Sequence, residues 1–315
     1  MTRRLRVRSL AKINLDLRVL YKRPDGFHEL RTIFQTISLA DTLDMEYRPG
    51  RTQIELKSNF NIPDNIIVRA AHEVLRATHT SGQVGFVLQK RIPLGAGLGG
   101  GSSNAAAVLL GLPALLGKPL PIDQLAELAA HLGSDVPFFL LGGTAVGLGR
   151  GTEVYPLPDV RSRPVLLITP GIHSSTAGAY AALQRKPKDK MTDSKLYDFQ
   201  RVTWHDSNRC VNDFEAVVFR QHPQLKSFKG KLLELGARPA LMSGSGSSVF
   251  GIFEDPDTRD RAQRWFRKEL AGNQVHSVSI VSRRRYRALW SRRLAACVGS
   301  ELSTEIWPPQ DRYAK

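Results

Sequence analysis

The residues most directly suited to chemistry are five glycines within a stretch of seven positions. They occur in IPLGAGLGGGSSNAAAVLL, residues 92–110, at positions 95, 97, 99, 100 and 101. Glycine adopts left-handed backbone angles without steric cost and lets another molecule approach the main chain closely, although it loses much entropy on folding. So dense a cluster indicates a loop whose backbone N–H groups bind a ligand.

The residues on either side of this loop predict the elements that position it. Residues 84–88 predict a buried strand before the loop, and the alanine-rich run after it predicts a helix that ends at about Gly117. Ser102, Ser103 and Asn104 are suited to cap that helix. Unpaired N–H groups and the positive end of the helix dipole then meet at the loop, and both favour an anion such as phosphate.

Three kinds of phosphate loop can be compared with this stretch. A P-loop ends in Gly-Lys-Ser or Gly-Lys-Thr, but no lysine follows Gly101. A dinucleotide-binding loop needs an acidic residue about 20 positions later at the tip of the next strand, whereas Asp123 begins a predicted helix. The third pattern, Pro-x-x-x-Gly-Leu-Gly-Gly-Gly-Ser-Ser, matches the chain from Pro93 to Ser103.

This third pattern resembles the ATP loop of the GHMP kinases, a superfamily of small-molecule kinases. The resemblance runs from about Lys12 to Leu289 and includes AKINLDLRVLYKRPDGFHEL, LGSDVPFF, NDFEAVVF and LMSGSGSSVFGIF. It implies an α+β fold of two domains, with a β-rich N-terminal domain that binds ATP and a smaller α/β C-terminal domain. It also implies that ATP binds to Pro93, Leu94, Gly95, Ala96, Gly97, Leu98, Gly99, Gly100, Gly101, Ser102 and Ser103.

The order of these motifs is most similar to that of GHMP kinases acting on a cytidylyl methylerythritol. The resemblance implies transfer of the γ-phosphate of ATP to the 2-hydroxyl of that acceptor, in non-mevalonate isoprenoid precursor synthesis. Mg²⁺ is expected to arrive with ATP, because phosphate oxygens and water supply most of its ligands. No protein metal ligand is assigned, although the hydroxyl of Ser103 is a candidate. A mevalonate or homoserine kinase is the alternative, but neither needs the cytosine-binding turn implied for RPDGFHEL.

Two residues far apart in the sequence are candidates for the catalytic pair. Asp135 lies between the end of one predicted helix and Pro137, where a carboxylate serves either as an N-cap or as a catalytic group. Lys12 lies on the polar side of a predicted strand, where a solvated lysine is the ordinary interpretation. The resemblance implies that Asp135 is the catalytic base, that Lys12 pairs with it, and that Asn14, on the same strand face, contacts a substrate hydroxyl.

The acceptor needs an aromatic platform and a hydrogen-bonding group for its cytosine. The resemblance implies that Phe27 stacks on the base and His28 hydrogen-bonds to it, with phenylalanine in place of the tyrosine common in the family. It further implies that Tyr180 stacks on the other face of the base and that Thr176 approaches the reacting hydroxyl. The turn at residues 243–248 is either a simple connection or part of the phosphate site.

The length and apolar pattern of the chain predict two domains. We expect residues 1–158 to form the N-terminal domain, 159–290 the C-terminal domain and 291–315 an extension. Alternating residues from 5 to 19 predict a long half-buried strand or hairpin arm. Helices are predicted from Asp64 and from Asp123, each aspartate acting as the N-cap.

The net charge of +16 raises the alternative of a nucleic-acid-binding protein. Arginines gather in residues 3–8 and 282–293, but no zinc-finger, RRM, KH or basic-zipper pattern accompanies them. We therefore expect a basic surface, a small-molecule substrate and no nucleic-acid or membrane partner. Two cysteines, no signal peptide and no long apolar run favour a cytoplasmic location. The oligomeric state is not predicted.

Overall fold

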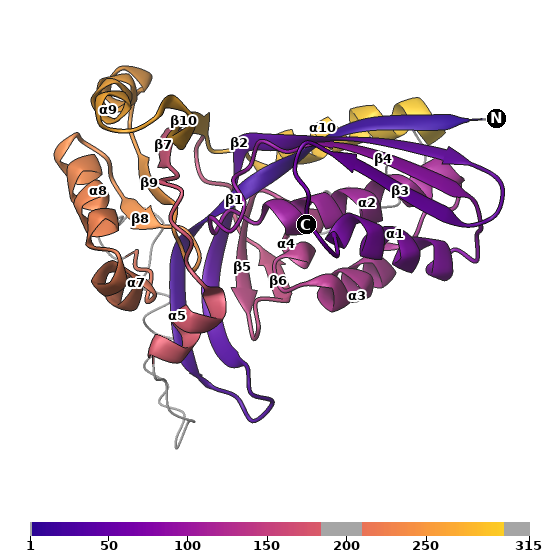
Figure 1. Ribbon diagram of the computed structural model, residues 1–315, viewed down its shortest axis with the longest axis horizontal. Coiled ribbons are helices and arrows are strands. Elements are labelled where there is room, and N and C mark those ends of the chain that lie inside the picture. The colour runs from indigo at the N-terminus through magenta and orange to yellow at the C-terminus, as the bar shows by residue number, and fades with distance from the viewer. Residues whose placement is uncertain (1, 184–209, 299–315) are drawn as a thin grey trace, which may run out of the picture.

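The computed structural model describes residues 2–183 and 210–298, which form two β-sheets with helices packed around them (Figure 1). The larger sheet has the order β3-β4-β2-β5-β6, and β1 pairs with β2 outside this path. Its strands are β1 (Arg3–Lys22), β2 (His28–Arg48), β3 (Gln53–Ser58), β4 (Gln83–Gln89), β5 (Thr144–Leu148) and β6 (Glu153–Pro156). The long antiparallel hairpin β1–β2 extends from this sheet to the second one.

Strand β1 is buried on both faces in its middle, so the expectation of a half-buried strand was wrong. Ala11, Ile13 and Leu15 pack toward the second sheet. Lys12 and Asn14, on the opposite face, are also buried. An alternating pattern predicts one solvated face, but here other parts of the protein cover the polar face as well.

Four helices cover one face of the larger sheet and form its hydrophobic core (Figure 1). They are α1 (Ile66–Ala77), α2 (Gly100–Leu116), α3 (Ile122–Leu132) and α4 (Val136–Leu141). Helix α2 is buried over nearly its whole length, as expected for a helix that is apolar all round. Its end at Gly117, with φ 71°, confirms the predicted stop.

The starts of three helices differ from the predictions. Helix α2 begins at Gly100 after an N-cap at Gly99, and no side chain caps it. Helix α1 is capped by Asn65 and not by Asp64, and α3 has Pro121 at its N-cap, which leaves Asp123 in the first turn. For α1 and α3 the cap differs from the prediction by one and two residues, within the usual scatter of helix ends, whereas α2 begins earlier, with the left-handed Gly99 at its cap.

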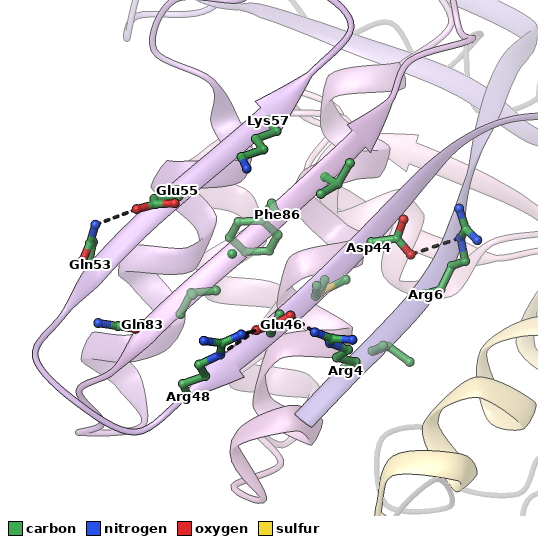
Figure 2. A pocket seen from close by; sticks show the side chains of 15 residues that line it. Arg4, Arg6, Asp44, Glu46, Arg48, Gln53, Glu55, Lys57, Gln83 and Phe86 are labelled. Atoms are coloured by element: carbon green, nitrogen blue, oxygen red, sulfur yellow. Dashed lines mark hydrogen bonds and ion pairs between the residues drawn. The ribbon is translucent and has the colours of Figure 1, made fainter. Parts of the chain in front are cut away.

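The other face of the larger sheet is open and carries ion pairs between neighbouring strands (Figure 2). Arg4 lies 2.8 Å from Glu46, and Arg6 lies 3.0 Å from Asp44. The strand β4 is therefore only half-buried, with Val87 44% exposed, although its apolar sequence predicted a buried strand. The paired charges make this face suited to solvent.

The second sheet has the order β10-β7-β9-β8 and its own core. Its strands are β7 (Pro164–Ile168), β8 (Ala240–Met242), β9 (Val249–Ile252) and β10 (Val275–Ser279), and its helices are α5 (Thr176–Leu183), α7 (Glu215–Gln221), α8 (Pro223–Glu234) and α9 (Pro256–Glu269). We propose a domain boundary near residue 158, because β6 and β7 belong to different sheets. A third cluster of apolar side chains joins the two sheets across β1.

The helix α10 (Arg283–Val298) returns from the second sheet to the core of the first (Figure 1). Tyr286, Trp290 and Leu294, spaced four residues apart, are buried there, and the hydroxyl of Tyr286 donates to the carbonyl of Phe139. The expected extension therefore does not begin at Ser291, because one helix continues through that position. Residues 299–315 of the expected extension lie outside the described residues.

None of the helices in the described ranges combines the length and apolar character needed to cross a membrane.

We predict that Leu294→Ala lowers the free energy of unfolding by about 2–5 kcal/mol, the usual cost of emptying a buried leucine site. Urea denaturation of the full chain measures this change. The matched control is Arg293→Ala, an exposed position on the same helix, which should stay within about 0.5 kcal/mol of the parent. Equal stabilities for the two variants would mean that α10 does not contribute to the core.

Candidate active site

The glycine loop connects β4 to α2 and depends on backbone angles that favour glycine. Gly95, Gly97 and Gly99 have φ of 61°, 74° and 67°. A Cβ atom on Gly97 would clash with the carbonyl of Ser243, so the loop and the turn 243–248 are in direct backbone contact. A cavity of ≈ 280 Å³ is lined by this loop from Pro93 to Ser102.

The turn 243–248 is part of this site and not a free connection. The hydroxyl of Ser243 donates to the carbonyl of Gly97 at 2.9 Å, and the amide of Ser248 donates to the carbonyl of Ala96 at 3.3 Å. These bonds join a turn of the C-terminal domain to the loop of the N-terminal domain.

The two serines at the end of the loop differ in what they face. Ser102 lines the loop cavity. Ser103 is buried, and its hydroxyl donates to the carbonyl of Leu10 at 2.7 Å. The Ser103 hydroxyl is therefore directed into the protein interior and not toward a metal ion beside the loop.

The catalytic pair expected from the sequence is close together in the structure. Lys12 Nζ lies 3.4 Å from Asp135 Oδ2 and donates to Asn14 Oδ1 at 2.7 Å. The Lys12 side chain is 4% exposed and that of Asp135 is 32% exposed, so the lysine is not a solvated surface residue. Asp135 occupies the N-cap position of α4, but its side chain makes no capping hydrogen bond. Its carboxylate is thus available to a ligand.

Several elements hold Lys12 in place. Its backbone amide donates to the carbonyl of Leu98 at 3.0 Å, which attaches β1 to the glycine loop. Asn14 Nδ2 donates to the hydroxyl of Thr32 at 2.7 Å, which leaves Asn14 Oδ1 directed at the lysine. A Cβ on Gly99 would lie 2.9 Å from Phe139 Cζ and 3.1 Å from Lys12 Cγ, so a side chain there would crowd both residues. The ammonium position is therefore fixed by both its strand and the loop.

A larger cavity, of ≈ 620 Å³, connects the glycine loop with the turn before β2. It brings together residues of both predicted subsites. Its lining includes Lys12, Asn14, Phe27, His28, Gly97, Gly99, Ser102, Asp135, Thr176 and Tyr180. The expected catalytic and acceptor-binding residues thus face one continuous space that reaches the glycine loop.

Aromatic side chains form part of the wall of this cavity, which we call its aromatic end. His28 and Tyr180 stack with ring centroids 4.9 Å apart, and Phe214 contacts Tyr180 edge-on at 4.8 Å. Burial, with a smaller effect of Lys22, lowers the pKa of His28, which favours the neutral imidazole. A neutral imidazole offers one donor and one acceptor, as recognition of a nucleobase edge requires. Burial and the charge of Asp135 raise the pKa of Tyr180 to about 12, which keeps its hydroxyl protonated.

The structure adds residues that the sequence did not single out. The guanidinium of Arg150 lies 3.5 Å from the ring centroid of Phe27, a side chain that is 49% exposed. Ser245 Oγ lies 2.8 Å from Thr176 Oγ1. In the sequence Arg150 stands between two glycines, a pattern that could have marked it as a candidate binding residue. Nothing local indicated that it would reach the turn at Phe27. In this structure Arg150 covers Phe27, while His28 stacks on Tyr180.

The described residues contain no group of three or more His, Cys, Asp or Glu side chains that could hold a metal ion. Among the described residues that line the larger cavity, Asp135 is the only carboxylate, and Ser102 brings a hydroxyl from the glycine loop. Such a small set fits an ion that brings most of its ligands with it.

Comparison with known proteins supports these features. Two family models match the chain, GHMP kinases N terminal domain at residues 65–143 and GHMP kinases C terminal at residues 199–272. A curated 4-diphosphocytidyl-2-C-methyl-D-erythritol kinase of Solibacter usitatus is 52% identical over 99% of this chain and 98% of its own.

Two crystal structures are similar in fold. A 4-(cytidine 5'-diphospho)-2C-methyl-D-erythritol kinase has a TM-score of 0.74 and 37% identity, covering 88% of this chain and 99% of its own. A homoserine kinase from Cytophaga hutchinsonii has a TM-score of 0.66 and 18% identity, covering 89% and 95%. The second similarity concerns the fold alone. The long and close sequence match therefore places this chain in the 4-diphosphocytidyl-2-C-methyl-D-erythritol kinase family of the GHMP kinases.

Proposed function

We propose that this protein transfers the γ-phosphate of ATP to the 2-hydroxyl of 4-diphosphocytidyl-2-C-methyl-D-erythritol, a step in non-mevalonate isoprenoid precursor synthesis. The observation that carries the proposal is the Lys12–Asp135 pair, which lines one cavity together with the glycine loop and the His28–Tyr180 stack. The 52% identity to a relative of that name supports the choice of acceptor.

The glycine loop is the proposed site of the ATP phosphates. Its backbone runs beside a cavity and leads into α2, so its amides and the positive end of the helix dipole favour negative charge. Mg²⁺ bound to the phosphates would neutralise part of their charge, with Ser102 and Asp135 as the nearby oxygen donors.

Asp135 and Lys12 are the proposed catalytic residues. Asp135 accepts the proton of the acceptor hydroxyl. The hydroxyl oxygen then forms a bond to the γ-phosphorus, while the bond between that phosphorus and the leaving ADP breaks. Lys12, 3.4 Å from that carboxylate, stabilises negative charge on the transferring group. Asn14 orients the lysine through the 2.7 Å hydrogen bond.

The aromatic end of the cavity is the proposed site for the cytosine of the acceptor. His28 supplies hydrogen bonds, and Phe27 and Tyr180 supply stacking surfaces, each base stack being worth about 1–3 kcal/mol in nucleic-acid systems. Because His28 stacks on one face of Tyr180 in this structure, a base that stacks on that face would displace the imidazole. Thr176, paired with Ser245, lies on the wall where the acceptor would pass. The proposed partners are ATP and this small molecule, in the cytoplasm.

The direct test is an incubation of the full chain with labelled ATP, Mg²⁺ and one acceptor at a time. We expect labelled phosphate on 4-diphosphocytidyl-2-C-methyl-D-erythritol and none on mevalonate or homoserine. Transfer to either of the latter two alone would assign the protein to another GHMP activity. A protein that bound duplex DNA in a salt-dependent manner and transferred phosphate to none of the acceptors would support the nucleic-acid alternative.

We predict that Asp135→Asn lowers kcat by about 10²–10⁴-fold, the usual contribution of a general base. The amide keeps the shape of the side chain but does not accept the proton, so the Kd for ATP should remain close to that of the parent. Steady-state kinetics and calorimetry measure the two quantities. The control is Asp44→Asn on the open face of the sheet, and unchanged turnover in Asp135→Asn would exclude this residue as the base.

We predict that His28→Ala lowers kcat/KM for the cytidylyl acceptor about tenfold or more, the effect of losing a hydrogen bond to a bound base. The KM for ATP should change little, because His28 does not line the cavity beside the glycine loop. His72→Ala, at an exposed position of α1, is the matched control. Equal losses toward ATP and acceptor would mean that the cytosine site lies elsewhere.

A further inference from the structure

A second buried ion pair lies beneath the glycine loop and has no role in the proposed chemistry. Lys90 Nζ is 2.6 Å from Asp41 Oδ2, with side-chain exposures of 3% and 0%. Removing two charges from water is costly unless each is fully hydrogen-bonded. This pair therefore needs an explanation in the structure around it.

The Asp41 carboxylate connects the two flanks of the glycine loop. Its Oδ1 accepts from the amides of Arg91 and Ile92 at 2.7 and 2.8 Å, directly before the loop. Its Oδ2 accepts from Asn104 Nδ2 at 2.9 Å, in α2 directly after the loop. A single side chain of β2 thus fixes the distance between the strand exit and the helix that the loop joins.

Lys90 brings a positive charge to the base of the same loop. It lines the loop cavity, and a Cβ on Gly100 would lie 2.7 Å from its Nζ. The side chain of Asn59 holds the Lys90 backbone, accepting from its amide at 2.7 Å and donating to its carbonyl at 3.2 Å. Burial lowers the pKa of Lys90 against the opposing effect of Asp41, so the carboxylate helps to keep the lysine charged.

The location of this charge distinguishes it from the cations on the open face of the larger sheet. Arg4 and Arg6 are on the open face, where solvent and salt screen their charges. The Lys90 ammonium is buried and next to the first residue of α2, where the helix dipole is also positive. Asp41 offsets much of the Lys90 charge at 2.6 Å, and the remaining positive field of the ammonium and of the start of α2 favours an anion at the loop.

We propose that Asp41 and Lys90 are positioning residues for ATP. Asp41 holds the loop in the shape that presents its amides, and Lys90 adds a fixed positive charge behind them. The inference rests on the proposed binding of ATP phosphates at this loop. It means that ATP binding requires a residue outside the glycine loop motif, because Asp41 lies more than fifty positions before Pro93 in the sequence.

The experiment measures ADP binding by calorimetry, the KM values for ATP and acceptor, and thermal stability for Lys90→Met and Asp41→Asn/Lys90→Met. We expect Lys90→Met to raise the Kd for ADP and the KM for ATP about tenfold, as for loss of one charge interaction, with the acceptor KM unchanged. Lys57→Met, an exposed lysine of β3 on the open face (Figure 2), is the control and should match the parent.

The double variant separates positioning from a merely structural pair. It contains no buried charge at these positions, and Asn104 Oδ1, which has no hydrogen-bond partner among the described residues, is free to accept from the new amide. We expect the melting temperature to recover relative to Lys90→Met while the Kd for ADP stays raised. Recovery of both, or parent-like ADP binding by Lys90→Met, would overturn the proposal.

A further variant decides the matter if the double variant does not fold. Asn104→Ala keeps the ion pair but releases α2 from Asp41, and it should also weaken ADP binding. An unchanged Kd for ADP would show that Asp41 does not hold the loop. Failure of the proposed function is a separate result, because the parent would then fail to bind ADP or to phosphorylate the cytidylyl acceptor.

Discussion

The burial of the Lys12 ammonium is the constraint on which the candidate site depends. A charge removed from water is stable only with close partners, and Lys12 has them in Asn14 Oδ1, Asp135 Oδ2 and the ring of Phe34, whose centroid is 5.7 Å away. These partners belong to β1, to the N-cap of α4 and to β2. Stabilising one charge therefore fixes three elements relative to one another, and it places a carboxylate where a hydroxyl group can approach it.

The glycine loop depends on the second domain in a similar way. Its backbone contacts the turn 243–248. Asn212 holds this turn in place, because its Nδ2 donates to the carbonyls of Met242 and Gly244 at 2.7 and 2.8 Å. The apolar cluster between the two sheets supports this contact from behind. The cavity therefore exists at the junction of the domains, and neither domain forms it alone.

Exposed ion pairs on the open sheet face and buried lysines near the cavities form two groups of charged side chains. Those on the open sheet face are paired with carboxylates and exposed to salt (Figure 2), so each contributes little by itself. Lys12 and Lys90 are buried near the cavities and are poorly screened. The net charge of +16 adds a general attraction for anionic molecules, which suits a site for ATP and a diphosphate-containing acceptor.

The sequence by itself was sufficient for features that depend on local conformation. The turns at Gly95, Gly97 and Gly99 and the helix stop at Gly117 follow from the left-handed backbone angles that glycine tolerates. The helix stop at Gly133 and the place of Asp135 before Pro137 were also predicted from local signals. More than one hundred positions separate Lys12 from Asp135, so no local pattern predicts that they pair. The family resemblance alone implied this pairing.

Only the tertiary structure decided which faces are covered. Periodicity shows that one side of a strand is polar but not whether water or another element meets it, so β1 was expected to be half-buried and β4 fully buried. For the same reason α10 was not expected to return to the first core, and neither Arg150 nor the Asp41–Lys90 pair was singled out. Such features arise from contacts between segments distant in sequence, which a local pattern does not encode.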